Sequence, residues 1–321
     1  MLAKICIDAG LDPTVLVGAT TPDLKGNNYR VGASDFFIVE ACEYRRGFLH
    51  IQPAMVIVTT IDFDHYDTYP TKKSYRTVFK KLFQKLGPKG YLIAPAAEST
   101  AQFDVPKKNL ILWNTGKKRA QFSYRDGAIV ERHRRSDKLQ LRVPGEHNIR
   151  NALAAYAGAR TLGISSKSAL KSLKTFSGTS RRLEYKGNKN GVLLYDDYAH
   201  HPVEIAATLQ GIFSIHPRKK ICVVYQPHQY SRTRIFLKEF GNAFKKVNTV
   251  IVPNIYEARD TLKDKKSVSV KKLVDVLKSS GIAAIDGRGL AKTKHYLKKN
   301  YRSFDIVITM GAGDVWKALA F

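Results

Sequence analysis

The second half of the chain alternates short apolar runs with segments of helical hydrophobic period. The runs are four or five residues long, which is typical of buried strands, and each leads into a segment with apolar positions three or four apart. The predicted strands are 192–195, 221–225, 249–253, 282–285 and 305–309, and the predicted helices are 203–213, 233–245, 270–279 and 291–300. Such alternation over short links predicts a parallel, doubly wound sheet with right-handed crossovers.

The first half is less regular but also reads as α/β. An apolar helix over 2–9 is followed by a strand at 14–18, and buried strands are expected over 36–44 and 55–61. A helix at 74–86, strands at 90–94 and 110–113, and a polar, alternating antiparallel ribbon at 120–143 complete it, with the hairpin tip at 131–135. We therefore predict two domains, 1–179 and 180–321.

Length and composition set limits on the class of protein. The 321 residues can bury two cores, and no apolar run approaches the roughly 18–20 residues of a membrane span. The first residues do not have the pattern of a signal peptide. The three cysteines, Cys6, Cys42 and Cys222, are far apart, which favours reduced thiols in a cytoplasmic protein over disulfides or structural zinc.

The charge is strongly positive. Lysine and arginine number 54 against 27 acidic residues, a net charge of +27, so polyanions must be considered as partners. The basic pairs, however, are spread along the chain without interleaved aromatic residues, and no nucleic-acid-binding motif is present. We expect a solvated basic surface or anionic nucleotide substrates, and do not expect direct nucleic-acid binding.

Polar residues that could carry chemistry follow the first strand of the second half. The run Asp196-Asp197-Tyr198-Ala199-His200-His201-Pro202 lies between strand 192–195 and helix 203–213. Ligands bind at such strand ends in open α/β sheets, and two adjacent histidines are costly to bury without a purpose. The alternative is a solvated loop with proline in the first turn of its helix.

Acids also follow two strands of the first half. Glu40 and Glu43 end the strand at 36–44, and Asp62, Asp64, His65 and Asp67 follow the strand at 55–61. Carboxylates at the ends of two parallel strands suit Mg²⁺, which prefers hard oxygen ligands together with phosphate oxygens. Alternatively, these acids only cap the next helices.

Two further segments suggest nucleotide contacts. At 144–155 a glycine turn opens an alanine-rich helix with His147, Asn148 and Asn151, and such side chains can stack on adenine or pair with its edge. A plain helix cap is the alternative. Arg181 and Arg182 lie at the domain junction, where arginine can close on phosphate; otherwise they form a surface basic pair.

Taken together, these segments resemble the Mur ligases. The resemblance rests on Asp-Asp-Tyr-Ala-His-His-Pro at 196–202, the Gly-x-His-Asn-x-x-Asn-Ala pattern at 145–152, the arginine pair, and Gln-Pro-His-Gln-Tyr-Ser-Arg-Thr-Arg at 226–234. The last segment favours the branch that adds L-alanine to UDP-N-acetylmuramate in peptidoglycan synthesis. The loop 255–260 resembles the family's acceptor loop.

The resemblance implies an ATP-dependent, ADP-forming acid–amino-acid ligase that works through an acyl phosphate, with ATP and Mg²⁺ as cofactors. It implies a central ATP-binding domain and a C-terminal Rossmann-like ligase domain. Implied catalytic residues are His200, Arg181 and His228; implied nucleotide contacts are His147, Asn148, Asn151, Arg181 and Arg182. Implied substrate contacts are Asp197, Tyr198, His200, His201, His228, Arg232, Arg234 and Glu257; the implied metal ligands are Glu40 and His65. Thr60 and Cys42 depart from the family's Asn and frequent acid, which weakens the metal assignment.

The chain also lacks parts of the family pattern. It starts within a helix with no strand before it, and the phosphate-binding motif G-x-x-x-x-G-K-[ST] is absent, the nearest match being Gly116-Lys117-Lys118. The family's N-terminal nucleotide-sugar domain is missing too. We therefore expect an incomplete form that is inactive alone, with the missing domain on the same or another chain. The rival interpretations are a muropeptide-recycling ligase of the same family and a non-catalytic binding remnant.

Overall fold

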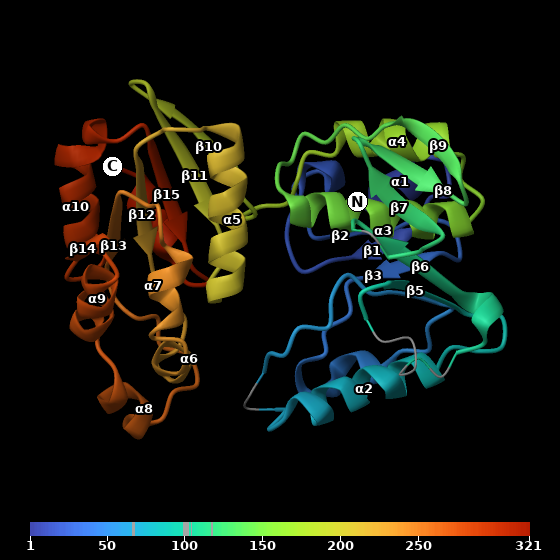
Figure 1. The fold of residues 1–321 in the computed structure, drawn as a ribbon, viewed down its shortest axis with the longest axis horizontal. Helices are drawn as coiled ribbons and strands as arrows, with labels where there is room; N and C mark the ends of the chain where they lie inside the picture. Colours follow the sequence, from blue (N-terminus) through green and yellow to red (C-terminus); the bar gives the residue numbers. More distant parts are fainter. Residues whose placement is uncertain (66–67, 99–102, 104, 117) are drawn as a thin grey trace. The chain divides into compact units, whose positions relative to one another are not determined.

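The computed structural model describes residues 1–65, 68–98, 103, 105–116 and 118–321. The chain divides into two compact units, Met1–Gly178 and Thr179–Phe321 (Figure 1). Each has its own hydrophobic core, and the fold is mixed α/β as expected from the sequence. Among the described residues, no helix has the length and apolar character needed to cross a bilayer.

The second unit is built on one six-stranded sheet with the order β10-β11-β15-β12-β13-β14. The strands are β10 (Glu184–Lys189), β11 (Val192–Asp197), β12 (Ile221–Tyr225), β13 (Thr249–Val252), β14 (Ala283–Asp286) and β15 (Ile306–Met310). All are parallel except β10, which pairs antiparallel with β11. The predicted parallel sheet is confirmed; β10 escaped prediction because its residues are mostly polar and exposed.

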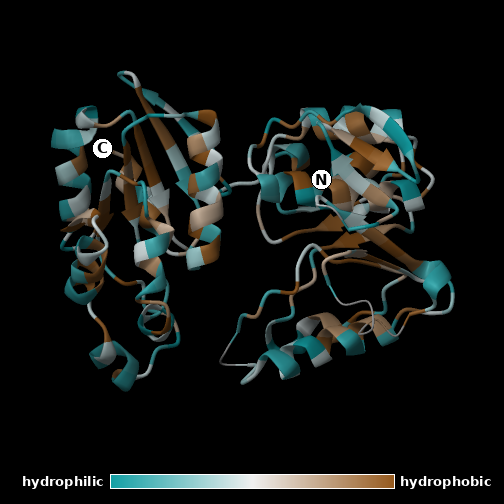
Figure 2. Cartoon of the chain, viewed as in Figure 1, coloured by the Kyte–Doolittle hydropathy of each residue, from teal (hydrophilic) through white to brown (hydrophobic). Residues whose placement is uncertain are grey.

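Alternate strand residues face two helical layers, so the sheet is doubly wound. One layer contains α5 (Pro202–Ile215), α7 (Glu239–Ala243) and α9 (Val270–Ser279), which bury Val223 and Ile308. The other contains α10 (Leu290–Asn300) and the 3₁₀ turns Tyr301–Ser303 and Val315–Leu319, which bury Val224 and Val307. In Figure 2 the central strands of this sheet are mostly brown and the outer helices carry much teal, as burial of both sheet faces requires.

One helix of the second unit differs from its prediction. The segment 233–245 forms two short helices, α6 (Tyr230–Ile235) and α7, instead of one. In addition, α8 (Leu262–Ser267) was not predicted, because it buries no residue and so has no hydrophobic period. A capping box between Thr261 and Asp264 marks its start.

The first unit contains two sheets. Six strands have the order β4-β5-β6-β7-β8-β9, and three have the order β2-β1-β3. The larger sheet comprises β4 (Met55–Ile57), β5 (Tyr91–Pro95), β6 (Leu110–Asn114), β7 (Phe122–Arg125), β8 (Ala128–Glu131) and β9 (Arg134–Lys138); the smaller comprises β1 (Thr14–Leu16), β2 (Tyr29–Arg30) and β3 (Phe37–Val39). The predicted ribbon is β7-β8-β9, with Arg132 and His133 in left-handed conformations at its tip.

Helices cover both faces of the larger sheet. On one face lie α1 (Leu2–Asp8), α3 (Glu146–Thr161) and α4 (Ser166–Thr175), where the small residues of α3 allow close packing. On the other lies α2 (Lys72–Gln84), whose Tyr75 and Phe83 join an aromatic cluster.

The prediction of a buried strand over 36–44 was wrong. Only Phe37–Val39 is a strand, and the Phe37 side chain is 58% exposed. This strand forms the edge of the small sheet, and Leu16 and Tyr29 of the two neighbouring strands are exposed as well, at 45 and 57%.

Candidate active site

Loops at the carboxyl ends of parallel strands gather at one edge of the second unit's sheet. They follow β11, β12, β13 and β15, and the loops after β12 and β13 are joined by backbone hydrogen bonds. Gln229 N donates to Tyr256 O at 2.9 Å, and Tyr256 N donates to Pro227 O at 2.8 Å. The backbone therefore fixes these two loops against each other.

Four aromatic rings from three of these loops form a row. Tyr198 and His200 meet edge to face, with ring centroids 5.5 Å apart. The His200 and His228 rings are 5.6 Å apart, and His228 stacks on Tyr256 at 5.8 Å with an interplanar angle of 16°. The structure thus brings together the two predicted catalytic histidines, which are 28 residues apart in the sequence.

His228 is held in its neutral form. Burial lowers the pKa of His228 to about 4, and the neighbouring His200, Arg232 and Arg259 act in the same direction. Its Nδ1 atom is buried and has no hydrogen-bond partner among the residues that the structure describes. A neutral imidazole with an unsatisfied nitrogen can accept or donate one hydrogen bond to a ligand.

Helix α5 orients the two adjacent histidines. His200 Nδ1 lies 3.0 Å from Tyr198 O, and because a carbonyl only accepts, this nitrogen carries the proton. Glu204 Oε2 accepts from the backbone N–H groups of both His200 and His201, at 3.1 and 3.2 Å. His201 Nδ1 accepts from Val203 N at 3.3 Å, so this ring caps the helix.

The Asp197 side chain is buried within the second unit. Asp197 is 3% exposed, and its carboxylate accepts hydrogen bonds from Leu183 N at 2.6 Å, Ala199 N at 2.7 Å and Thr208 Oγ1 at 3.2 Å. Burial raises the pKa of Asp197 to about 6, against the opposing effect of these hydrogen bonds. These bonds connect the start of the unit to the site loop and to α5, so Asp197 also holds the loop in place.

The two arginines predicted to act together are in different environments. Arg181 Nε donates to Asp196 Oδ2 at 2.9 Å, Nη1 donates to Gly313 O at 2.9 Å, and Nη2 donates to Gly311 O. Every nitrogen of this guanidinium is therefore used within the unit. Arg182 is exposed, and its guanidinium carbon lies 5.7 Å from the centroid of the Tyr198 ring.

The remaining predicted contacts lie at the margin of the ring row. Arg232 is half-buried and Arg234 exposed on α6, which is tied to the next loop because Ser231 N and Oγ donate to Asp260 Oδ1 at 3.0 and 3.1 Å. Glu257 forms an ion pair with Lys265 of α8, which draws its carboxylate towards that helix.

Two site residues were missed by the sequence reasoning. Tyr256 was quoted only as part of a loop, yet it stacks on His228. Gly313 carries no signal of its own in the sequence, but a Cβ there would lie 2.4 Å from both Gln226 Oε1 and the Tyr256 ring, so the site loop requires glycine. The stacking of Tyr256 and the need for glycine at 313 depend on residues that are distant in the sequence, so only the structure shows them.

In the first unit, the predicted adenine residues form a tight turn at the start of α3. Gly145 has a φ of +98°, and a Cβ there would lie 2.7 Å from the His147 ring. Asn148 Nδ2 donates to Pro144 O at 2.7 Å and lies 3.1 Å from His147 Nε2. The turn thus fixes both side chains, and Asn151 follows one helical turn later.

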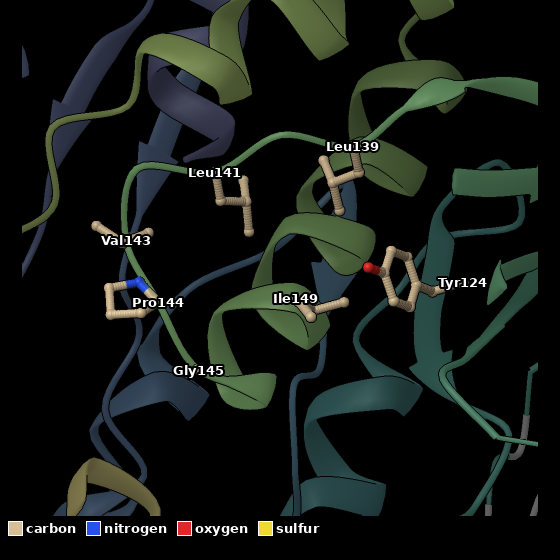
Figure 3. Close-up of a pocket in the computed structure, with 7 residues that line it drawn as sticks. All are labelled: Tyr124, Leu139, Leu141, Val143, Pro144, Gly145 and Ile149. Carbon is tan, nitrogen blue, oxygen red and sulfur yellow. The ribbon is translucent and has the colours of Figure 1, made fainter. Parts of the chain in front are cut away.

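A pocket of about 210 Å³ lies beside this turn (Figure 3). Its walls come from β7, the segment after β9, and the first turn of α3; the lining residues are Tyr124, Leu139, Leu141, Val143, Pro144, Gly145 and Ile149. The predicted adenine residues do not line it. The pocket and the polar turn share only Pro144 and Gly145.

The predicted metal ligands take separate partners. Glu40 Oε2 accepts from Gly18 N at 2.9 Å, whereas His65 Nε2 lies 3.3 Å from Glu43 Oε1, which also accepts from Tyr75 Oη at 3.1 Å. Within the described ranges, no three His, Cys, Asp or Glu side chains are grouped to hold a metal ion. Asp67, another acid of this segment, lies outside the described residues. The side chains therefore fit Mg²⁺ only as part of a ligand set completed by phosphate oxygens.

The comparisons with known proteins agree with these segments. Residues 14–159 match the Mur ligase middle domain, and residues 181–313 match the glutamate ligase domain of Mur ligases. A UDP-N-acetylmuramate–L-alanine ligase of Clostridium acetobutylicum is 38% identical in an alignment 327 positions long, which covers 99% of this chain and 70% of that protein.

The chain belongs to the Mur ligase family. A second relative, from Clostridium kluyveri, carries the same ligase name at 39% identity, again over 99% of this chain and 71% of its own length. The crystal structure of the Thermotoga maritima alanine ligase of this family superposes with a TM-score of 0.79 at 24% identity, covering 99% of this chain and 69% of that one. A murein peptide ligase from Psychrobacter arcticus superposes at 0.68 with 21% identity, covering 99% and 74%, which shows a shared fold. This Mur ligase chain therefore has the middle and C-terminal folds of the family.

Proposed function

We propose that the chain provides the ATP-binding domain (1–179) and the ligase domain (180–321) of an enzyme that joins L-alanine to UDP-N-acetylmuramate. The names of the relatives at 38 and 39% identity support this substrate pair over a peptide acceptor. The structural observation that carries the proposal is the row of four rings, Tyr198, His200, His228 and Tyr256, at the strand ends of the second unit.

The proposed reaction has two steps. First, the carboxylate of UDP-N-acetylmuramate attacks the γ-phosphorus of ATP, the bond to the bridging oxygen of ADP breaks, and an acyl phosphate forms. The amine of L-alanine then attacks the acyl carbon through a tetrahedral intermediate. The carbon–oxygen bond to phosphate breaks, releasing inorganic phosphate, and the amine loses a proton. Phosphorylation is needed because a carboxylate has no good leaving group.

In this proposal the ring row positions the acceptor amine. His228 is neutral over the physiological range, so its nitrogen can accept a hydrogen bond from the amine without electrostatic repulsion. His200 holds its ring through Tyr198 O and presents it to His228. His201 acts through the cap of α5, whereas Arg232, Arg234 and Glu257 would contact outer parts of the substrates.

For the nucleotide, we propose His147, Asn148 and Asn151 as adenine contacts and Arg182 as the phosphate contact. Arg182 is the better candidate for phosphate because it is exposed. The three guanidinium nitrogens of Arg181 already donate hydrogen bonds to Asp196, Gly311 and Gly313. Arg181 is then a positioning residue. Glu40 and His65 would hold Mg²⁺ together with phosphate oxygens, and the bound ion would supply neutralisation of phosphate charge.

The test is an assay with the chain, ATP, UDP-N-acetylmuramate and L-alanine, in which the part of the Clostridium acetobutylicum ligase outside the 327-residue match is supplied as a second polypeptide. We expect ADP, phosphate and the alanyl product in equal amounts. His228→Gln should lower the rate by about a hundredfold, whereas His216→Gln, a histidine at the far end of α5, should not.

Two results would refute the proposal. One is faster ligation of a tripeptide than of L-alanine, which would indicate a recycling ligase. The other is the absence of any product when the second polypeptide is shown to be bound.

A further inference from the structure

Gln226 lies where three of the site loops meet. It directly follows β12, which has β15 on one side in the sheet and β13 on the other. The residue is 0% exposed, and its backbone N–H donates to Met310 O at 2.9 Å, at the end of β15. Gln226 is therefore buried beneath the loops that carry the ring row, two residues before His228 in the chain.

The amide group of Gln226 joins the loops on both sides of it. Nε2 donates to Asp314 Oδ1 at 3.0 Å, in the loop after β15, and to Asn254 Oδ1 at 3.2 Å, in the loop after β13. Because a carboxylate only accepts hydrogen bonds, the nitrogen and not the oxygen of the amide must face Asp314. One buried side chain therefore links three strand-end loops.

The amide oxygen of Gln226 has no hydrogen-bond partner within the described part of the chain. A Cβ on Gly313 would lie 2.4 Å from this oxygen and 2.4 Å from the Tyr256 ring, so the glycine backbone packs against both. A buried unpaired oxygen lowers stability, and a methionine of similar length would not have this cost. Stability alone therefore does not account for an amide at this position.

Gly313 and Tyr256 connect this amide to His228. The Tyr256 ring stacks on the His228 ring at 5.8 Å, and the Gly313 backbone packs against the Tyr256 ring. Gly313 O also accepts from Arg181 Nη1 at 2.9 Å, which is a second anchor for the loop after β15. Loss of the Gln226 bonds would loosen the contact with Tyr256 while this second anchor keeps the loop attached to the unit.

We propose that Gln226 is a positioning residue for His228: its amide holds the loops after β13 and β15 together, so that Tyr256 keeps the His228 ring in place for the acceptor amine. The role of the amine rests on the proposed function, whereas the placement of the ring does not. Gln226 itself touches neither substrate in this proposal.

The first test uses the chain alone, without substrates. Gln226→Met keeps the length of the side chain but removes the two donated bonds and the unpaired oxygen. The pKa of His228, followed by NMR of the imidazole nitrogens, should rise from about 4 by about 1 or more, because the ring gains contact with water. The other groups that act on this pKa are not altered in the variant: His200, Arg232, Arg259 and Asp260.

The same variant should leave the second unit as stable as before. Asn254 and Asp314 are only half-buried, so both can turn to water when Gln226 no longer donates to them. The urea midpoint, followed by Trp316 fluorescence in a Trp113→Phe background, should therefore stay the same or rise.

A paired glutamine of the first unit provides the matched control. Gln121 Oε1 accepts from Leu112 N at 2.8 Å, and its Nε2 donates to Leu110 O at 3.1 Å. Gln121→Met should lower the urea midpoint of the first unit and leave the pKa of His228 unchanged. An unchanged pKa of His228 in Gln226→Met would overturn the proposal. A fall in the urea midpoint as large as that of the control would also overturn it, because Gln226 would then be an ordinary structural residue.

A second variant tests one link alone. Asn254→Ala removes the bond to the loop after β13 without a change of charge, and should raise the pKa of His228 by less than Gln226→Met does. No rise in this variant would exclude the loop after β13 from the proposal.

The second test is the ligation assay with the second polypeptide described above. Gln226→Met should raise the KM for L-alanine by about tenfold and leave the KM for ATP within about twofold. A lower kcat with an unchanged KM for L-alanine would overturn the positioning role. If the unaltered chain shows no ligation, the proposed function fails, but the pKa of His228 still tests the role of Gln226.

Discussion

The two units differ in how well strand-end side chains assemble into a site. In the second unit, β11, β12, β13 and β15 belong to one sheet, and their loops bring His200, His228 and Tyr256 into ring contact. In the first unit, β3 and β4 belong to different sheets, and Glu40 and His65 take separate partners. Residues at strand ends converge when the strands share a sheet, because only then do the carboxyl ends lie along one edge.

The largest expected effect on stability comes from the ion pair between Arg181 and Asp196, which lies next to the site loops of the second unit. Arg181→Met should lower the free energy of unfolding of the second unit by about 3–5 kcal/mol, because it leaves Asp196, which is 2% exposed, without its cation. Arg182→Met is the matched control and should change it by no more than about 0.5 kcal/mol. Urea denaturation followed by Trp316 fluorescence in a Trp113→Phe background measures both. An equal loss in the free energy of unfolding for the two variants would show that Arg181 does not stabilise the unit more than Arg182 does.

A smaller effect is expected from Asp197. Its pKa is raised from 3.8 to about 6 by burial, so between these values the folded unit binds more protons than the unfolded chain. Stability from this group is therefore present below about pH 4 and is lost as the pH rises to about 6. Asp197→Asn lacks this titration, so the difference in free energy of unfolding between wild type and variant should shrink over that range. A constant difference would show that Asp197 titrates normally.

The next prediction concerns the pKa of His228 rather than the stability of the unit. Because its pKa is lowered to about 4, NMR of the imidazole nitrogens should show a neutral ring at pH 5.5, where an ordinary histidine is mostly charged. The variant Tyr256→Ala uncovers one face of the ring and should raise the pKa towards 6.5. A ring that titrates near 6.5 in the wild type would remove the argument for a neutral acceptor.

The smallest effect is expected in the first unit. Glu40→Gln keeps an oxygen that can accept from Gly18 N, so the free energy of unfolding should change by no more than about 0.5 kcal/mol. Trp113 fluorescence in a Trp316→Phe background reports this unit. If the variant also leaves Mg²⁺-dependent ATP binding unchanged, the proposed metal role of Glu40 is excluded.

The strands and helices of the second unit were largely predictable. The strand at 221–225 and the helix at 270–279 were predicted with the bounds that the structure shows, because a parallel sheet buries short apolar runs and an amphipathic helix repeats its apolar positions. By contrast, the exposure of Phe37 could not be read from the sequence, since an apolar run has the same pattern whether or not another element covers it.

The sequence alone determined the doubly wound fold of 180–321, the family resemblance, and the segments that carry polar chemistry, because these depend on periodicity and on motifs close together along the chain. The tertiary structure decided which of those residues meet. It gave Arg181 and Asp197 internal partners, left Arg182 exposed, placed Tyr256 on His228, and separated β3 from β4. The physical reason is that hydrogen bonds and ring contacts between distant segments depend on sheet order, which local pattern does not encode.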